Sequence, residues 1–151
     1  MRLAGSCHCQ RVRFELDTAW HYPYQWCFCE ICRKTNGSAF ACNIKGRKAD
    51  FRILQGEEHL KKYRAVSVDR YFCGTCGSQL FILDDAWPDG VWPNAAAIDT
   101  PLPRCSEQVH IFVRSKVPWY PIRTPGAQYD TYPELSIDAF HERMGWLPGP
   151  D

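Results

Sequence analysis

The chain has 151 residues, of which 45% are hydrophobic, 18 are Lys or Arg and 17 are Asp or Glu, so its formal net charge is +1. It is long enough to bury one hydrophobic core, and it has no apolar stretch of about eighteen residues that would cross a membrane as a helix. The balanced charge, without a basic run, gives no indication of a nucleic-acid partner. We therefore expect one domain over residues 1–151 that works with neither a membrane nor nucleic acid.

Polar and apolar residues alternate strictly over residues 11–17, which predicts a half-buried strand, and the alternation recurs over 38–45. Glycine, proline and Asn-Gly breakers separate further short apolar segments. Strands are predicted in these segments, at 51–54, 59–64, 68–72, 79–83, 94–98 and 109–113. Short strands at this spacing predict a mainly β fold, built as a sandwich, a barrel or a folded pair of sheets.

Helix is predicted in only two places. About one turn is expected after Cys29, and a short capped helix is expected over 136–144, ending at Gly145. Residues 118–133 are rich in proline and tyrosine, so this segment is expected to run irregularly over the surface.

Nine of the residues are cysteines. That many indicate either the disulfides of a secreted protein or the metal-binding thiols of a cytosolic one. The first six residues lead directly to Cys7 without the apolar segment of a signal peptide. We expect a cytoplasmic protein with reduced thiols, and clustered reduced thiols indicate a metal.

Seven of the cysteines lie in three short clusters. They are Cys7-His8-Cys9, Cys27-Phe28-Cys29-Glu30-Ile31-Cys32 and Cys73-Gly74-Thr75-Cys76-Gly77. In an extended chain, residues two apart point to the same side, so each C-x-C offers two thiols together. The C-x-x-C-G spacing predicts a tight turn, for which Gly77 supplies the backbone freedom.

Zinc takes four ligands in a tetrahedron, and four thiolates are a common structural set. Seven cysteines divide most simply into a closed group of four and a group of three with an open coordination position, which is typical of catalytic zinc. Spacing alone does not decide which pair joins Cys73 and Cys76, although contiguity favours keeping residues 27, 29 and 32 together. Alternatively, Cys42 closes the second site as a fourth ligand, or it is a small buried hydrophobe.

Several motifs together resemble one known family. They are Gly5-Ser6-Cys7-His8-Cys9, Cys27-Phe28-Cys29-Glu30-Ile31-Cys32-Arg33, Gly37-Ser38-Ala39-Phe40, Arg70-Tyr71-Phe72-Cys73-Gly74-Thr75-Cys76-Gly77-Ser78 and His110-Ile111-Phe112-Val113-Arg114-Ser115-Lys116. Over about residues 3–120 the chain resembles the glutathione-dependent formaldehyde-activating enzyme (GFA) family, which also includes centromere protein V.

This resemblance implies a β-tent of two antiparallel sheets with zinc knuckles and few short helices. It also implies a structural zinc and a second, catalytic zinc. The structural zinc would be held by Cys7, Cys9, Cys73 and Cys76, and the catalytic zinc by Cys27, Cys29 and Cys32. The Pro- and Tyr-rich tail at 121–151 lies outside the resemblance and is expected to set specificity.

The charge of the second site narrows its chemistry. Zn²⁺ with three thiolates carries a net charge of −1, which weakens the Lewis acidity that hydrolysis by zinc-bound water requires. A substrate thiol bound as thiolate is favoured instead. The resemblance implies a carbon–sulfur lyase of the S-hydroxymethylglutathione synthase type, whose partners are a small thiol such as glutathione and a small aldehyde such as formaldehyde. The sequence does not indicate an oligomeric state.

Two other functions are compatible with the same residues. One is a non-enzymatic binding module on the same zinc-stabilised fold, since one fold serves many functions. The other is a thiol redox sensor, in which the cluster at 27–32 cycles between a zinc-bound and a disulfide form.

Residues near the clusters have expected roles as well. Arg33 either binds a substrate carboxylate or is a solvated surface arginine. His8 is expected to point away from the metal, and His110 to be a buried, hydrogen-bonded residue. Cys105 is expected to be an isolated thiol. Four aromatic residues are expected in the core, with one or two of them lining a pocket near the second zinc: Trp26, Phe40, Trp92 and Trp119.

Overall fold

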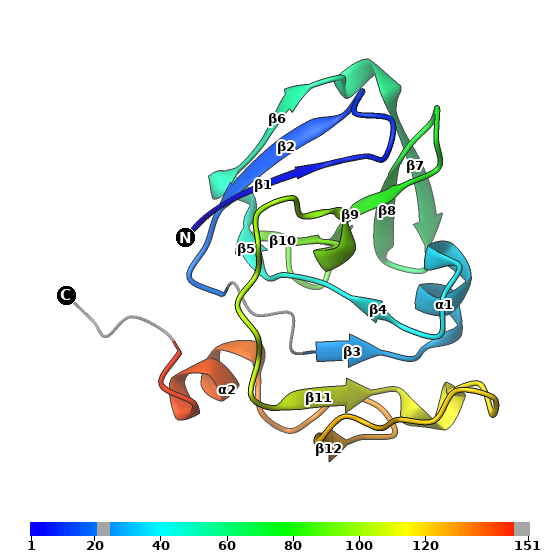
Figure 1. The fold of residues 1–151 in the computed structure, drawn as a ribbon, viewed down its shortest axis with the longest axis vertical. Helices are drawn as coiled ribbons and strands as arrows, with labels where there is room; N and C mark the ends of the chain where they lie inside the picture. The colour runs from blue at the N-terminus through cyan, green and yellow to red at the C-terminus, as the bar shows by residue number, and fades with distance from the viewer. Residues whose placement is uncertain (21–24, 147–151) are drawn as a thin grey trace. The chain divides into compact units, whose positions relative to one another are not determined.

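The structure is a computed structural model, and it describes residues 1–20 and 25–146. Its chain contacts divide it into two compact units (Figure 1). Unit 1 comprises Met1–Pro23 and Cys42–Pro103, and unit 2 comprises Tyr24–Ala41 and Arg104–Asp151. The single domain expected from the sequence stays a prediction.

One sheet of unit 1 has three antiparallel strands in the order β1-β2-β6. These are β1 (Arg2–Ser6), β2 (Arg13–Asp17) and β6 (Phe51–Gln55). The strands predicted at 11–17 and 51–54 are thus confirmed. Alternate residues of β2 are buried, with Phe14 and Leu16 fully so, which is the half-buried pattern that strict alternation predicts.

The other sheet of unit 1 has five strands in the order β5-β10-β9-β8-β7. Their bounds are β5 (Gly46–Arg47), β7 (Leu60–Ala65), β8 (Val68–Cys73), β9 (Gln79–Asp84) and β10 (Gly90–Pro93). Three predicted strands are confirmed here, but the one at 94–98 is wrong. Asn94 caps a 3₁₀ turn at Ala95–Ala97, because its side chain accepts a hydrogen bond from the Ala96 N–H. An asparagine side chain competes in this way with strand pairing.

Apolar side chains of both sheets form one core within unit 1. It consists of Leu3, Cys7, Val12, Phe14, Leu16, Ile44, Cys73, Leu80, Phe81 and Val91. Two cysteines of the predicted structural zinc site are therefore part of the core, where solvent does not reach them.

Unit 2 contains a sheet with parallel pairing. β11 (Gln108–Ile111) pairs in parallel with both β3 (Gln25–Cys27) and β12 (Gly126–Gln128). The strand predicted at 109–113 is confirmed, whereas the segment 118–133, expected to be irregular, contains β12. The strand predicted over 38–45 shrinks to β4 (Ala41–Cys42), which lies across the division between the units.

Unit 2 also contains the two α-helices, α1 (Glu30–Asn36) and α2 (Ile137–Arg143). α1 is longer than the single turn expected after Cys29, because Cys29 caps its start and Gly37, in the left-handed conformation, caps its end. α2 confirms the helix predicted over 136–144, with Ser136 as its N-cap. The last residues of the tail, 147–151, lie outside the described residues.

The remaining helical segments are short 3₁₀ turns: Lys48–Asp50, Glu57–His59, Ala95–Ala97 and Val113–Ser115. The mainly β fold with few short helices is confirmed. The described strands form three sheets rather than two, and one of these sheets contains parallel pairs. Among the described residues, no helix has the length and apolar character needed to cross a membrane.

Candidate metal centres

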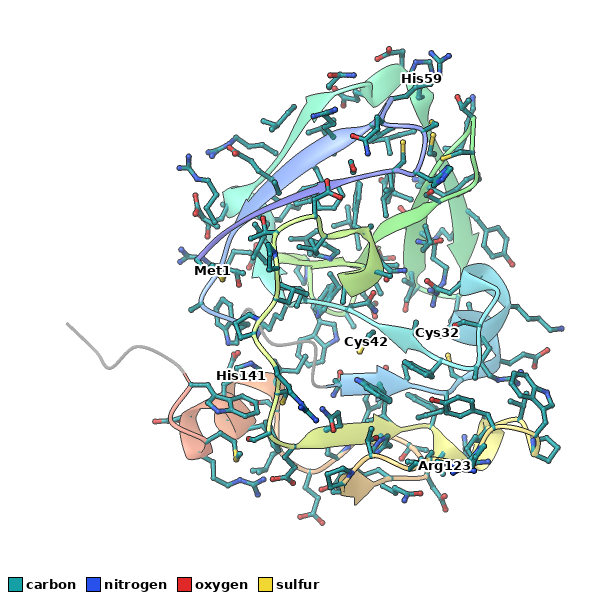
Figure 2. All side chains as sticks on the ribbon, in the orientation of Figure 1. Met1, Cys32, Cys42, His59, Arg123 and His141 are labelled. Atoms are coloured by element: carbon teal, nitrogen blue, oxygen red, sulfur yellow. The ribbon has the colours of Figure 1, made fainter. Side chains whose placement is uncertain are left out.

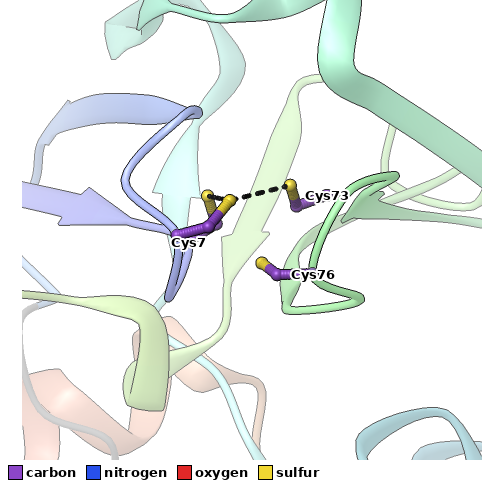
Figure 3. Close-up of side chains that lie close together, drawn as sticks. Cys7, Cys73 and Cys76 are labelled. Atoms are coloured by element: carbon purple, nitrogen blue, oxygen red, sulfur yellow. Dashed lines mark hydrogen bonds between the residues drawn. The ribbon is translucent and has the colours of Figure 1, made fainter.

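Four cysteines of unit 1 converge from two hairpin turns. Cys7 and Cys9 lie in the turn that follows β1, Cys73 ends β8, and Cys76 lies in the turn between β8 and β9. Figure 3 shows the sulfur atoms of Cys7, Cys73 and Cys76 pointing toward one another. All four Sγ atoms lie within 4.8 Å of one another.

These separations match a metal site and exclude a disulfide. Cys7 Sγ lies 3.5 Å from Cys9 Sγ, which lies 3.8 Å from Cys73 Sγ. Four sulfurs bound tetrahedrally to zinc at ~2.3 Å lie about 3.8 Å apart, whereas a disulfide requires about 2.05 Å. None of the nine cysteines, each of which falls within the described ranges, forms a disulfide. The donor set therefore fits a zinc ion.

Backbone and hydroxyl groups form hydrogen bonds with two of these thiols, Cys7 and Cys76. The Val12 N–H donates to Cys7 Sγ at 3.3 Å, and the Ser78 hydroxyl lies 3.3 Å from Cys76 Sγ. The hydrogen bond with Ser78 is the main reason that the pKa of Cys76 is lowered to about 5. A backbone hydrogen bond from Arg11 also lowers the pKa of Cys9, but burial and the neighbouring thiols outweigh it and raise that pKa to about 11.

The local geometry differs from the sequence prediction in one respect. β1 ends at Ser6, so the Cys7-His8-Cys9 pair lies on a turn, and turn geometry rather than strand alternation brings its thiols together. His8 is exposed, as expected for a residue that points away from the site. Gly77 has φ of 76°, which confirms the unusual dihedral predicted for the C-x-x-C-G turn.

The second group lies in unit 2 on one short segment. Cys27 ends β3, Cys29 is the N-cap of α1, and Cys32 is buried in the first turn of that helix. The three Sγ atoms lie within 4.8 Å of one another. The Cys32 N–H donates to Cys29 Sγ at 3.3 Å. Figure 2 shows Cys32 at the end of α1 that adjoins β3.

An aromatic cluster surrounds this segment. Phe28, between two of the thiols, is fully buried, and its ring contacts those of Phe40 and His110. Trp26 stacks on Phe40 with ring centroids 4.5 Å apart. The pKa of Cys27 is raised, chiefly by its hydrogen bonds with the other two thiols and also by burial. A divalent cation among the three sulfurs would reverse this effect, because it stabilises thiolates.

Other predicted residues take the following places. His110 is fully buried and bonded to the Ala127 carbonyl and the Thr124 hydroxyl, as expected of a structural histidine. Cys105 donates to the Glu107 carbonyl and belongs to neither group. Cys42 falls in the other unit from the group of three, and its role as a fourth ligand stays a prediction.

Two further predicted residues of unit 2 are Arg33, which follows Cys32 directly, and Trp119. The Arg33 Nε donates to the Phe28 carbonyl at 3.2 Å. Trp119 is 69% exposed, so its assignment to the core is wrong. Sequence reasoning missed the supporting roles of Ser78, Val12 and Phe28. Ser78 and Phe28 could have been found, because they lie within the motifs C-x-x-C-G-S and C-F-C. The hydrogen bond from Val12 to Cys7 is visible only in the folded structure.

Together, the fold and these two groups define a class: a mainly β protein with two clusters of cysteines that can each hold a metal ion. Residues 2–115 match the family described as "Glutathione-dependent formaldehyde-activating enzyme" (GFA). The chain belongs to this family.

Two known proteins are similar to the chain. A protein of Halomonas elongata named "Putative glutathione-dependent formaldehyde-activating enzyme" is 41% identical over 159 aligned positions, which cover 99% of this chain and 100% of that protein. The crystal structure of a Rhodobacter sphaeroides protein matches with a TM-score of 0.56 and 26% identity, over 68% of this chain and 92% of the other.

Proposed function

We propose that this protein is a zinc-dependent carbon–sulfur lyase of the S-hydroxymethylglutathione synthase type, which joins a small thiol to a small aldehyde or separates them. The group of three thiols in unit 2 carries the proposal, in a chain whose family is named for glutathione and formaldehyde. In the forward reaction, the thiol sulfur attacks the carbonyl carbon and the thiol proton ends on the carbonyl oxygen. The reverse reaction breaks the same carbon–sulfur bond.

The two groups of cysteines would hold two zinc ions with different tasks. Cys7, Cys9, Cys73 and Cys76 would form a closed structural site, and Cys27, Cys29 and Cys32 a site with one open position. When bound in the second site, zinc would supply the positive charge that stabilises a substrate thiol as its thiolate.

The residues of unit 2 support this chemistry in three ways. The hydrogen bond from the Cys32 N–H to Cys29 Sγ orients a ligand sulfur. Buried Phe28 lies between two of the thiols and limits the access of water to them. Arg33, fixed to the Phe28 carbonyl, offers a positive charge to a substrate carboxylate.

The experiment combines metal analysis with a rate measurement. We expect two zinc ions per chain by elemental analysis of protein purified under reducing conditions. Exchange NMR with ¹³C-formaldehyde and glutathione should show adduct formation faster than the uncatalysed reaction. Cys29→Ser should retain one zinc per chain and lose the acceleration. Cys105→Ser is the matched control, because a serine hydroxyl preserves the bond to the Glu107 carbonyl, and it should behave like the wild type.

Several results would contradict the proposal. One zinc per chain in the wild type, or full acceleration in Cys29→Ser, removes the catalytic centre. Loss of the second zinc in Cys42→Ser would show that a fourth side chain closes the site, which favours a binding module. Zinc release by mild peroxide, reversed by a reductant, in a protein without catalytic acceleration would favour a redox sensor.

A further inference from the structure

One serine links the two turns that hold the four cysteines of unit 1. The Ser78 hydroxyl lies 3.3 Å from Cys76 Sγ, which is in the turn between β8 and β9. The same hydroxyl accepts a hydrogen bond from the backbone N–H of His8 at 3.1 Å. His8 stands between Cys7 and Cys9 in the turn after β1, so the hydroxyl joins chain segments that are 70 residues apart. Figure 3 shows the Cys7 and Cys76 side chains facing each other from these two turns.

The donor and acceptor roles of these groups fix the direction of the two bonds. A backbone N–H can only donate, so the His8 N–H occupies a lone pair of the Ser78 oxygen. The serine proton is then left for Cys76 Sγ. A cysteine that binds a metal ion has lost its proton and can only accept, so with an ion in the group Ser78 must donate to Cys76. A hydrogen bond to a ligand atom holds that atom in its binding orientation.

Other hydrogen bonds shape each turn separately. In the first turn, the Cys7 N–H donates to the Val12 carbonyl at 3.1 Å, and the Val12 N–H donates to Cys7 Sγ. In the second turn, the Gly77 N–H donates to the Cys73 carbonyl at 2.8 Å, and the Cys73 N–H donates to the Ser78 carbonyl at 3.0 Å. Each of these bonds stays within one turn. The Ser78 hydroxyl, in contrast, connects a ligand sulfur of the second turn to the backbone of the first.

A third segment supports the backbone of both turns. It is the 3₁₀ turn Glu57–His59 with Gly56 as its N-cap. The Gly74 N–H donates to the His59 carbonyl at 2.8 Å, and a Cβ on Gly56 would overlap the Arg11 carbonyl. These contacts place the backbone of the two turns, and they leave the positions of the sulfur atoms to other groups. The Ser78 hydroxyl is such a group, because it contacts a ligand sulfur directly.

We propose that Ser78 is a positioning residue of the group of four. Its hydroxyl holds Cys76 Sγ in place relative to the turn of Cys7 and Cys9, and it thereby determines how firmly the group keeps a metal ion. The inference rests on the part of the proposed function that assigns a structural zinc to these four cysteines. It adds to them a residue that is not itself a ligand. Groups that hydrogen-bond to ligand atoms change metal affinity by about 10- to 100-fold.

The test measures the zinc affinity of the group of four by competition with a chelator of known affinity. It uses the full chain with Cys29→Ser, because this variant should retain zinc in the group of four only. Adding Ser78→Ala should weaken zinc binding by about 10- to 100-fold. Adding Ser78→Thr, which keeps the hydroxyl, should leave the zinc affinity within a few-fold of that of the Cys29→Ser chain, a range set by the same scale.

A spectrum of the loaded site separates this role from a general effect on folding. Co²⁺ in place of zinc gives sulfur-to-metal charge-transfer bands, whose energy rises when a hydrogen bond stabilises the electrons of a ligand sulfur. Ser78→Ala should therefore shift these bands to longer wavelength. Ser67→Ala is the matched control, because the Ser67 hydroxyl donates to the Asp84 carboxylate at 3.0 Å in the same unit. It also loses a hydroxyl hydrogen bond, but it should leave the zinc affinity and the bands unchanged.

The outcomes separate this inference from the proposed function. If the Cys29→Ser chain holds no zinc, the structural site of the proposed function fails. If that chain holds one zinc and Ser78→Ala changes neither the affinity nor the bands, the inference is overturned while the structural zinc stands. Should Ser78→Ala not fold, Ser78→Val and Ser78→Thr decide the point, because they have nearly the same shape and only the second has a hydroxyl. A weaker zinc affinity in Ser78→Val supports the inference, and equal affinities overturn it.

Discussion

The two groups of cysteines are built in opposite ways. In unit 1, the group of four joins a turn after β1 to a turn after β8, so Cys9 and Cys73 meet across 64 residues of sequence. In unit 2, the group of three comes from the single segment Cys27–Cys32. A metal in the first group would close a long loop and tie remote strands together, whereas in the second it would close only a short one. The first arrangement suits a structural ion, and the second leaves the ion's binding energy available for chemistry.

The pKa shifts of the thiols vary within and between the two groups. The pKa of Cys76 in unit 1 is lowered, first by the Ser78 hydroxyl, so this thiol is ionised near neutral pH. The pKa of Cys27 in unit 2 is raised, first by its hydrogen bond to Cys29. The pKa of Cys9 in the group of four is raised as well, to about 11, so each group contains a thiol whose ionised form would need the charge of a metal.

The largest predicted effect is on stability and separates the two groups. Cys73 is fully buried in the core of unit 1, and Cys73→Ser should remove a ligand of the proposed structural site and lower the free energy of unfolding by more than about 4 kcal/mol. Cys29→Ser should cost less than about 2 kcal/mol, because its site closes only a short loop. Urea unfolding followed by circular dichroism measures both changes.

A reversed order would break the comparison. If Cys29→Ser destabilises the protein as much as Cys73→Ser, the second group is structural too. Zinc content measured on both variants shows whether each has lost one ion, and Cys105→Ser reports the cost of replacing a buried thiol that belongs to neither group.

A smaller effect of pH should appear in unit 2. Burial lowers the pKa of His110 below the usual value of 6.5, although the hydrogen bond to the Ala127 carbonyl raises it in part. The folded state therefore holds neutral His110, and the unfolded state binds the proton more tightly. The stability that His110 contributes is present above pH 6.5 and falls as the pH drops toward the lowered pKa, by at most about 1.4 kcal/mol per pH unit.

The measurement is a series of urea unfolding curves at pH 7.5, 6.5 and 5.5, with zinc content checked at each pH. His110→Phe retains an aromatic ring among the neighbours of Phe28 and cannot take up a proton. It should be less stable than the wild type at pH 7.5, because it loses the bonds to Ala127 and Thr124, but it should lose less stability on acidification. Equal pH slopes in the two proteins would show that His110 does not titrate as expected.

Much of the fold could be predicted from local patterns. Strict alternation located β2, and Gly and Pro breakers located β6 to β9, because these strands are half-buried and bounded by turns. The predictions of secondary structure fail where a side-chain hydrogen bond or pairing with a distant strand determines the local structure. Asn94 turns the predicted strand at 94–98 into a 3₁₀ turn. The strand β3 has only three residues and exists because β11, more than 80 residues later, pairs with it.

The candidate sites can also be predicted only where their residues lie close together in the sequence. The spacings Cys27–Cys32 and Cys73–Cys76 are enough to indicate two groups of thiols, since ligand spacing is a local property of the chain. Unit 2 also has a shallow hollow, lined by Arg33, Lys34, Gly37, Ser38 and Trp119, which could not be predicted in this way. Trp119 follows Arg33 by more than 80 residues, and an isolated tryptophan in the sequence resembles a core residue.

The smallest predicted effect tests whether the two units unfold together. Gly77 in unit 1 has φ of 76° and Gly37 in unit 2 has φ of 60°, and neither has a heavy atom within 4 Å of a prospective Cβ. An alanine at either position is destabilising only through its left-handed backbone, by about 1 kcal/mol. Because the local costs are matched, Gly77→Ala and Gly37→Ala should lower a single unfolding transition equally if the units form one cooperative domain. Two transitions, each shifted by only one of the variants, would show that each unit unfolds separately and that the proposed structural site stabilises unit 1 alone.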